Sequence, residues 1–91
     1  MMEVNITITG TERVFNVWTM ATATVNGKRF QVQMVKFEEP SIYGIRNGRI
    51  SKLWAKEENG TDNIAYDRGW SHRPATAEGK AFLKEIIKRY N

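Results

Sequence analysis

The chain has 91 residues, no cysteine and a net charge of +4. This length allows one domain with a modest core, and the lack of cysteine excludes disulfides, thiolate metal sites and thiol nucleophiles. No apolar run approaches the roughly 20 residues of a membrane helix, and the first residues do not follow a signal-peptide pattern. We therefore expect a single domain over residues 1–91 that is cytoplasmic and makes no contact with membranes.

The first part of the chain predicts β-strands. Residues 3–9 alternate apolar and polar side chains, which is typical of a strand with one buried face. Residues 10–12 then predict a turn. Residues 13–25 are long for one strand. Their apolar side chains occur at both odd and even positions, which would face opposite sides of a regular strand, and this indicates a bulge or bend.

The pair Asn26-Gly27 predicts a tight hairpin between residues 13–25 and 28–37. Both residues tolerate the positive φ of a type I′ turn. The alternation of apolar and polar residues slips at Met34-Val35, which predicts a second irregularity. Pro40 cannot donate a hydrogen bond to a strand ladder, so we expect the strand to end before it.

Two further hairpins are expected after Pro40. Residues 42–46 predict a short strand, and Asn47-Gly48 predicts a tight turn into a strand over residues 49–56. A polar loop over 57–63 leads to a last strand over 64–68. Residues 71–74 predict a connection without regular structure.

The C-terminal segment predicts an amphipathic helix over residues 77–90, with Thr76 as its N-cap, so that the element spans 76–90. Its apolar residues form one stripe of a 3.6-residue period: Phe82, Leu83, Ile86, Ile87 and Tyr90. Gly79 in the first turn suggests a close approach to the sheet. Together the elements predict an α+β fold: an antiparallel β-meander of five to six strands with one C-terminal α-helix packed on one face.

Two motifs carry a resemblance to a known family. They are GIRNGRISKLW at residues 44–54 and YDRGW at residues 66–70. The chain resembles a family of small uncharacterised proteins of phages and prophages of Gram-positive bacteria over roughly residues 22–91. Residues 1–21 then look like an N-terminal extension. The resemblance implies an origin in mobile elements, and it implies no functional residues because the family has no assigned activity.

Aromatic and basic residues concentrate between Tyr43 and Trp70, and this stretch is the candidate binding surface. The candidate residues are Tyr43, Arg46, Arg49, Lys52, Trp54, Lys56, Tyr66, Arg68 and Trp70. If the strands over 49–56 and 64–68 pair, a Lys-Trp-Lys row could lie beside a Tyr-Arg-Trp row. Such a platform would stack bases and meet phosphates. The alternative places Trp54 and Tyr66 in the core beneath the helix, with the lysines at its edge. Arg68 could also stack on a Trp or pair with Asp67 or a glutamate.

No residue pattern indicates catalysis, a cofactor or a metal site. His72 is the only histidine and falls in a polar connection, and the acidic pairs Glu38-Glu39 and Glu57-Glu58 fall at strand ends. No nucleophile, base and orienting group occur together, and no phosphate-binding loop is present. We therefore expect a protein that is not an enzyme.

Two functions remain open from the sequence. The first is a small phage or prophage accessory protein that binds a protein partner through the surface between Tyr43 and Trp70, because Trp, Tyr and Arg dominate interface energies. The second is a single-stranded nucleic-acid-binding module that uses Lys52, Lys56 and Arg68. Steep salt dependence would distinguish the second from the first.

Overall fold

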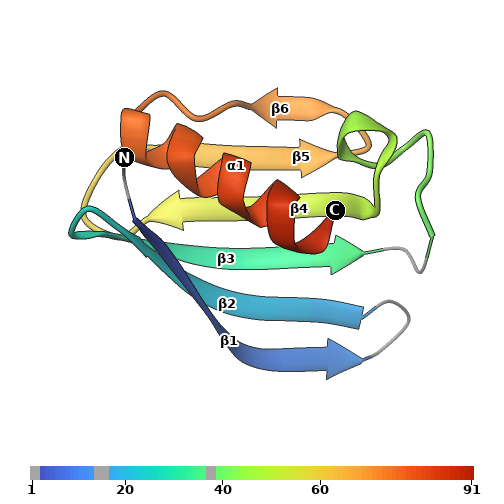
Figure 1. Ribbon diagram of the computed structural model, residues 1–91, viewed down its shortest axis with the longest axis horizontal. Helices are drawn as coiled ribbons and strands as arrows, with labels where there is room; N and C mark the ends of the chain where they lie inside the picture. The colour runs from blue at the N-terminus through green and yellow to red at the C-terminus, as the bar shows by residue number, and fades with distance from the viewer. Residues whose placement is uncertain (1–2, 14–16, 37–38) are drawn as a thin grey trace.

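The computed structural model describes residues 3–13, 17–36 and 39–91. These ranges form one antiparallel sheet whose strands follow chain order from β1 to β6, with one α-helix across it (Figure 1). The strands are β1 (Val4–Arg13), β2 (Val17–Val25), β3 (Lys28–Lys36), β4 (Ile50–Glu57), β5 (Asn63–Asp67) and β6 (Trp70–His72). A 3-10 helix, η1 (Ile45–Asn47), precedes β4, and α1 spans Ala77–Tyr90. The predicted α+β fold, a meander with one C-terminal helix on one face, is confirmed.

The hairpin between β2 and β3 forms as predicted. Asn26 and Gly27 have φ angles of 50° and 83°, and Val25 lies opposite Lys28. Positive φ at both central residues is the mark of a type I′ turn. The predicted irregularity near Val35 is also confirmed, because the register between β3 and β4 shifts between Val35 and Lys36.

The predicted turn at residues 10–12 is wrong. β1 continues through Gly10 to Arg13, and Gly10 lies opposite Met20 in β2. The register shifts between Ile8 and Gly10, so the irregularity is a break in the ladder pairing and the strand goes on beyond it. The expected long strand over 13–25 is accordingly divided between the end of β1 and β2, and residues 14–16 lie outside the described ranges.

The predicted strand over 42–46 and the hairpin at Asn47-Gly48 are also wrong. The left-handed residues are Arg46 and Asn47, with φ angles of 51° and 57°, whereas Gly48 has a φ of −103°. A type I′ hairpin would need positive φ at Asn47 and Gly48. The chain instead forms a loop that contains η1, and a hydrogen bond of 2.9 Å from Ser41 N to Gly48 O closes this loop.

The segment after β5 contains a strand where the sequence predicted only a connection. β6 is three residues long and pairs with β5, with Trp70 opposite Tyr66. Arg68 has a φ of 58°, and Asp67 N donates to Gly69 O at 3.0 Å. This tight turn reverses the chain directly after β5, so β6 can pair with β5. Three residues are too few to show the alternation of apolar and polar side chains that predicts a strand.

Helix α1 covers one face of the sheet. Thr76 caps it as predicted, because its Oγ1 accepts a hydrogen bond of 2.9 Å from Gly79 N. Phe82 and Ile86 are fully buried, and the Phe82 ring stacks on Phe30 of β3 with 5.5 Å between centroids. The other members of the apolar stripe, Leu83, Ile87 and Tyr90, pack against this core from its margin.

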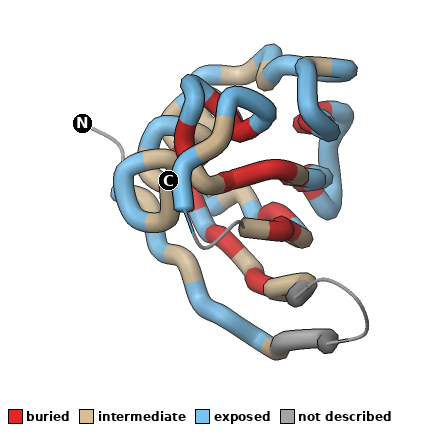
Figure 2. Tube along the Cα trace, turned by 90° about the vertical axis from the view of Figure 1, so that its right-hand side faces the viewer, coloured by how far each residue is buried: buried red, intermediate tan, exposed pale blue. Residues whose placement is uncertain are grey.

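The core lies between the sheet and α1, and Figure 2 shows buried residues along the central strands and exposed residues in the connections. Alternate residues of β2 to β5 face the helix. The buried sheet residues of this core are Ala21, Ala23, Val25, Phe30, Val32, Met34, Ile50, Leu53, Ala55, Ile64 and Tyr66. The small alanines of β2 leave room for the bulky side chains of α1, and burial of these apolar side chains is the main driving force for the fold.

Two polar side chains fix the ends of α1. At its start, the Asp62 carboxylate accepts hydrogen bonds from Ala75 N at 2.9 Å and from both the backbone N and the hydroxyl of Thr76. At its end, the Asn91 side chain accepts from Ile50 N at 3.0 Å and donates to Ile45 O at 2.9 Å. The helix is therefore tied to the β4–β5 loop at one end and to η1 at the other.

Candidate functional site

The sheet face that points away from α1 is the first candidate site, and we call it the open face. Its side chains come from β2 to β5 and alternate with the core residues. The pairing register sets them in three rows across the sheet: Trp18, Val35, Lys52 and Asp67; then Met20, Gln33, Trp54 and Ala65; then Thr22, Gln31, Lys56 and Asn63. Two tryptophans, a methionine and a valine therefore lie in adjacent rows of a face that α1 leaves uncovered.

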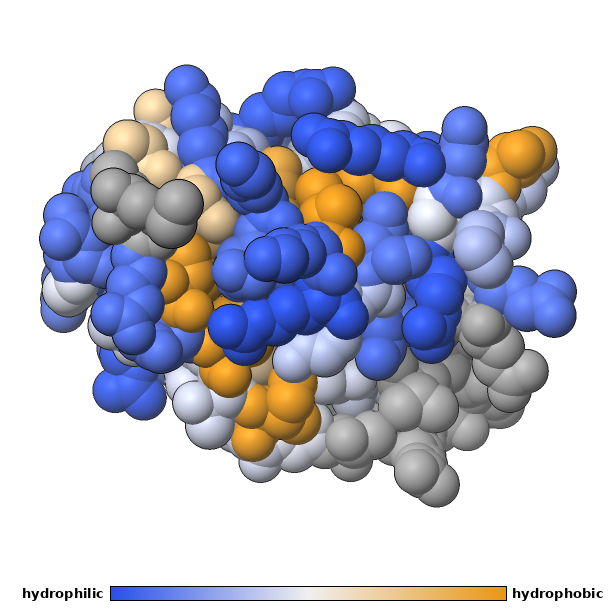
Figure 3. Space-filling view, in the orientation of Figure 1, coloured by the Kyte–Doolittle hydropathy of each residue, from blue (hydrophilic) through white to orange (hydrophobic). Residues whose placement is uncertain are grey.

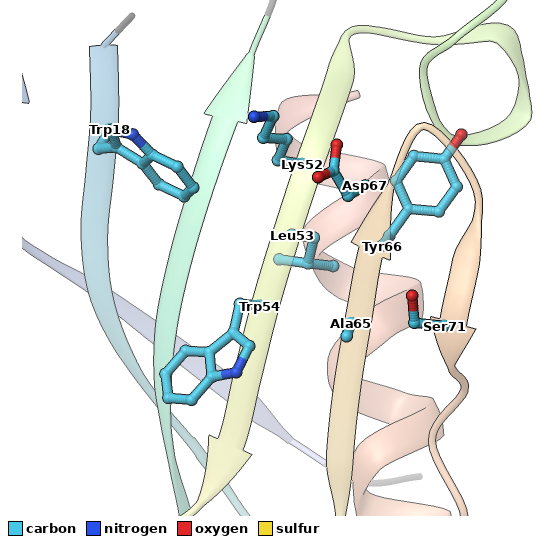
Figure 4. Close-up of a pocket in the computed structure, with 8 residues that line it drawn as sticks. All are labelled: Trp18, Lys52, Leu53, Trp54, Ala65, Tyr66, Asp67 and Ser71. Atoms are coloured by element: carbon cyan, nitrogen blue, oxygen red, sulfur yellow. The ribbon is translucent and has the colours of Figure 1, made fainter.

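Trp54 stands at the centre of the open face and is 38% exposed. On one side of it lies a pocket of about 180 Å³, which Trp18, Lys52, Ala65, Asp67 and Ser71 help to line (Figure 4). On the other side is a second hollow of about 320 Å³. It is lined by Gln31, Trp54, Lys56, Glu58 and Asn59. The ring is therefore accessible from two sides.

Charges of both signs surround Trp54. Lys52 lies opposite Asp67 in the β4–β5 register. Glu58 accepts from Arg29 Nε at 2.9 Å and from Gln31 Nε2 at 2.6 Å. The open face thus combines an apolar centre with a mixed polar rim, which is the usual anatomy of a protein–protein interface.

The predicted platform, with a Lys-Trp-Lys row beside a Tyr-Arg-Trp row, is wrong. Tyr66 lies on the helix side, is 8% exposed, and donates its hydroxyl to Tyr43 O at 2.9 Å. Trp70 also lies on that side and meets the Tyr66 ring edge-on, with 5.1 Å between centroids. The core interpretation therefore holds for Tyr66 but not for Trp54.

The β4–β5 register is the physical reason for this difference. Trp54 lies opposite Ala65, while Leu53 lies opposite Tyr66. Because side chains alternate between faces, a register that differs by one residue moves a whole strand's side chains to the other face. A shift of one residue would move the apolar side chains of β5 away from Leu53 and out from beneath α1.

The remaining predicted residues lie apart from Trp54. Tyr43 is 55% exposed in the loop before η1, and Arg46 is exposed within η1. Arg49 is half-buried immediately before β4, and Arg68 is exposed in the β5–β6 turn. None of these four lines either hollow beside Trp54 in the part of the chain that the structure describes.

Two important residues were missed by the sequence analysis. Trp18 lines the pocket beside Trp54, and the Asn26-Gly27 turn could have placed it, because that turn sets Trp18 opposite Val35. Arg73 lies over the Trp70 ring, with its guanidinium carbon 4.8 Å from the centroid, in the role considered for Arg68. No local pattern marks Arg73, because its position depends on β6.

The buried carboxylates have structural partners. Burial raises the pKa of Asp62, but hydrogen bonds from Ala75, Thr76 and Asn63 outweigh that effect and leave the pKa below its ordinary value. Glu57 lies 3.5 Å from Lys28 Nζ, which is 2.7 Å from Glu78 as well. Within residues 3–13, 17–36 and 39–91, no three His, Cys, Asp or Glu side chains are grouped so that they could hold a metal ion. No helix in the same ranges is long and apolar enough to cross a membrane.

The fold and this face define a class: a small α+β domain with a six-stranded antiparallel meander, one C-terminal helix and a sheet face that the helix leaves open. The chain belongs to the family of domains of unknown function designated DUF7678, which matches residues 17–91. No curated protein and no solved structure matches the chain. The whole of β1 (Val4–Arg13) precedes the matched region, yet β1 pairs with β2 along its length.

Proposed function

We propose that this protein acts by binding a protein partner through the open face, without catalysis. The observation that carries the proposal is the position of Trp54, which is 38% exposed between two hollows at the centre of the sheet face that α1 does not cover. Large aromatic residues at the centre of a polar rim contribute most to the affinity of protein interfaces. Trp18 extends the apolar centre across β3.

The charge pattern supports a protein partner over nucleic acid. Lys52 lies opposite Asp67 in the register, and Arg29 is paired with Glu58, so acidic side chains lie among the cations of this face and oppose the binding of phosphates. A single-stranded nucleic acid remains the second candidate, and one feature favours it. Lys52 and Lys56 flank Trp54 on the same strand face, so a base on the ring would have a cation on each side.

The biological setting belongs to the same proposal. The motifs GRISKLW and YDRGW support an origin in phages or prophages of Gram-positive bacteria, where the protein would serve as an accessory factor in the cytoplasm of the host cell. A small chain without cysteine is suited to that reducing compartment.

The test compares Trp54→Ala with Ile42→Ala as capture baits in host and phage-infected lysates, with and without nuclease. Ile42 is 77% exposed outside the open face, so its replacement controls for loss of an exposed apolar side chain. We expect Trp54→Ala to lose a partner that wild type and Ile42→Ala retain, with a decrease in affinity of about tenfold or more for the purified pair. Retention of that partner by Trp54→Ala would refute the open-face proposal. Loss of capture after nuclease treatment would favour the nucleic-acid alternative.

A further inference from the structure

A second groove lies on the opposite side of the molecule, where α1 meets η1 and the segment between β6 and α1. It encloses about 370 Å³, and its lining residues are Arg46, Arg73, Pro74, Lys80, Leu83, Lys84 and Ile87. Figure 3 shows this side of the molecule, with apolar surface visible between hydrophilic side chains over the helix. We call this feature the basic groove.

The basic groove carries positive charge that its own lining does not neutralise. Four of its lining residues are cations, and none of the described lining residues is acidic. The two carboxylates of α1 are engaged elsewhere: Glu78 lies 2.7 Å from Lys28, and Glu85 lies 3.4 Å from Arg89. Lys80 and Lys84 are four residues apart on α1, an arrangement of like charges that slightly destabilises a helix unless an anion lies between them.

The floor of the groove is apolar. Leu83 and Ile87 are one turn apart on α1, only partly buried, and lie at the margin of the core. Pro74 continues this surface toward the start of the helix. A ligand that fills the groove would therefore place an apolar group on Leu83 and Ile87 and negative groups against the surrounding cations.

The walls of the groove are held in place before any ligand arrives. Asn91 ties the end of α1 to Ile45, the neighbour of Arg46 in η1. Asp62 ties the start of α1 to Ala75, which follows Pro74. Arg73 is supported by its stacking on Trp70. A rigid site loses less conformational entropy on binding, which increases affinity.

We propose that the basic groove binds a short acidic peptide segment of a partner protein, with an apolar side chain seated on Leu83 and Ile87. This is a second binding site, on the side of the sheet away from Trp54, and it does not depend on the function of the open face. Nucleic acid fits less well, because no aromatic ring lines the groove among the described residues. The nearby ring of Trp70 already has the Arg73 guanidinium stacked on it. Binding of single strands relies on free rings for base stacking.

The test is fluorescence anisotropy of the full chain with a labelled peptide of alternating glutamate and leucine. Lys84→Glu is the test variant, and Lys88→Glu is the matched control, with the same charge change on an exposed position of α1 outside the groove lining. We expect Lys84→Glu to weaken binding by about tenfold or more and Lys88→Glu to weaken it by less than about threefold. Replacing glutamate by glutamine, or leucine by serine, in the peptide should also weaken binding. Thermal melts should show both variants folded, and Trp54→Ala should bind the peptide as wild type does.

Several outcomes would overturn this proposal. Equal losses in Lys84→Glu and Lys88→Glu would mean general attraction to a basic surface. Tighter binding of single-stranded oligothymidylate, with the same sensitivity to Lys84→Glu, would make the groove a nucleic-acid site, and preferential binding to phosphatidylglycerol vesicles would make it a membrane contact. Absence of peptide binding by the folded wild-type chain would refute it directly. A decrease with Trp54→Ala would place the peptide on the open face.

Discussion

At the scale of single residues, Asp62 is the side chain with the most consequence for the fold. The residue is 2% exposed, and its carboxylate accepts hydrogen bonds from Ala75 and Thr76 in the segment that begins α1, as well as from Asn63 N at 3.0 Å. It therefore links the β4–β5 loop to the N-cap of the helix. Hydrogen bonds to a charged acceptor are stronger than neutral ones, so this link is sensitive to protonation.

The pH dependence of stability follows from the lowered pKa of Asp62. A carboxyl group whose pKa is lower in the folded state stabilises the fold fully above its unfolded pKa of about 3.8, and this contribution is lost as pH falls through the folded pKa. We expect the free energy of unfolding, measured by urea titration, to decrease below about pH 4. Asp62→Asn should lower the free energy of unfolding by about 1–3 kcal/mol at neutral pH. Below about pH 4, the free energy of unfolding of this variant should decrease less with falling pH than that of wild type. If the decrease below about pH 4 were the same in Asp62→Asn as in wild type, other carboxylates would control acid unfolding.

A substitution at Gly79 tests the contact between Asp62 and the start of α1 from the helix side. Alanine is favoured over glycine in a helix by about 1 kcal/mol, so Gly79→Ala would stabilise an isolated helix. Here a Cβ at position 79 would collide with Asp62 Oδ2 and lie 3.0 Å from Pro74 Cβ. We expect the displaced carboxylate to outweigh the helix preference, with a net loss of about 1–2 kcal/mol in urea denaturation. Lys80→Ala, at an exposed position in the same turn, should change stability by less than about 0.5 kcal/mol. A stabilised Gly79→Ala would contradict this account of the contact.

At the scale of elements, α1 is the part of the fold whose sequence and structure agree most closely. Its range, its N-cap and its apolar stripe all follow from local signals, and the structure confirms each of them. The stripe has a centre of fully buried residues and a margin of partly buried ones. The same margin provides the floor of the basic groove.

The orientation of α1 can be tested with two aspartate substitutions. Ile86→Asp would bury a carboxylate without a partner, and we expect it to destabilise the domain by more than about 4 kcal/mol, enough to unfold a domain of this size. Lys84 is exposed, so Lys84→Asp should change stability by less than about 1 kcal/mol. Circular dichroism melts of both variants provide the measurement. Equal losses would mean that another face of the helix meets the sheet.

At the scale of the whole molecule, the sheet separates two surfaces of different chemistry. The open face presents Trp54 and Trp18 within a rim of mixed charge. The helix side presents the basic groove, where arginine and lysine surround an apolar floor. A partner could therefore occupy one surface without covering the other, and a domain with two such faces is suited to joining two proteins.

Tryptophan fluorescence tests this division. In variants that retain one Trp, with the others replaced by Phe, we expect acrylamide to quench Trp54 more strongly than Trp70. Trp54 is 38% exposed, whereas Trp70 is partly buried and contacts Tyr66 and Arg73. Iodide should show the same order. Stronger quenching of Trp70, or full shielding of Trp54 in a monomer, would mean that the sheet faces are assigned wrongly.

Local signals in the sequence determined much of the fold because they act between near neighbours. Asn26-Gly27 favours positive φ at two adjacent residues, and Thr76 and the apolar stripe define α1 through contacts within one or two turns. Tertiary structure decided whether Asn47-Gly48 made a hairpin, and it placed the left-handed conformation at Arg46 and Asn47. A dipeptide preference is too weak to override the bonds that tie η1 to Asn91.

Tertiary structure also decided which aromatic side chains lie on the open face. The sequence marks Trp54 and Tyr66 as large aromatics on neighbouring strands, but it does not state the register between those strands. Pairing of Leu53 with Tyr66 sends Tyr66 beneath α1 and leaves Trp54 on the open face. Because a shift of one residue exchanges the two faces of a strand, only the packing of the whole core could assign each ring to its side.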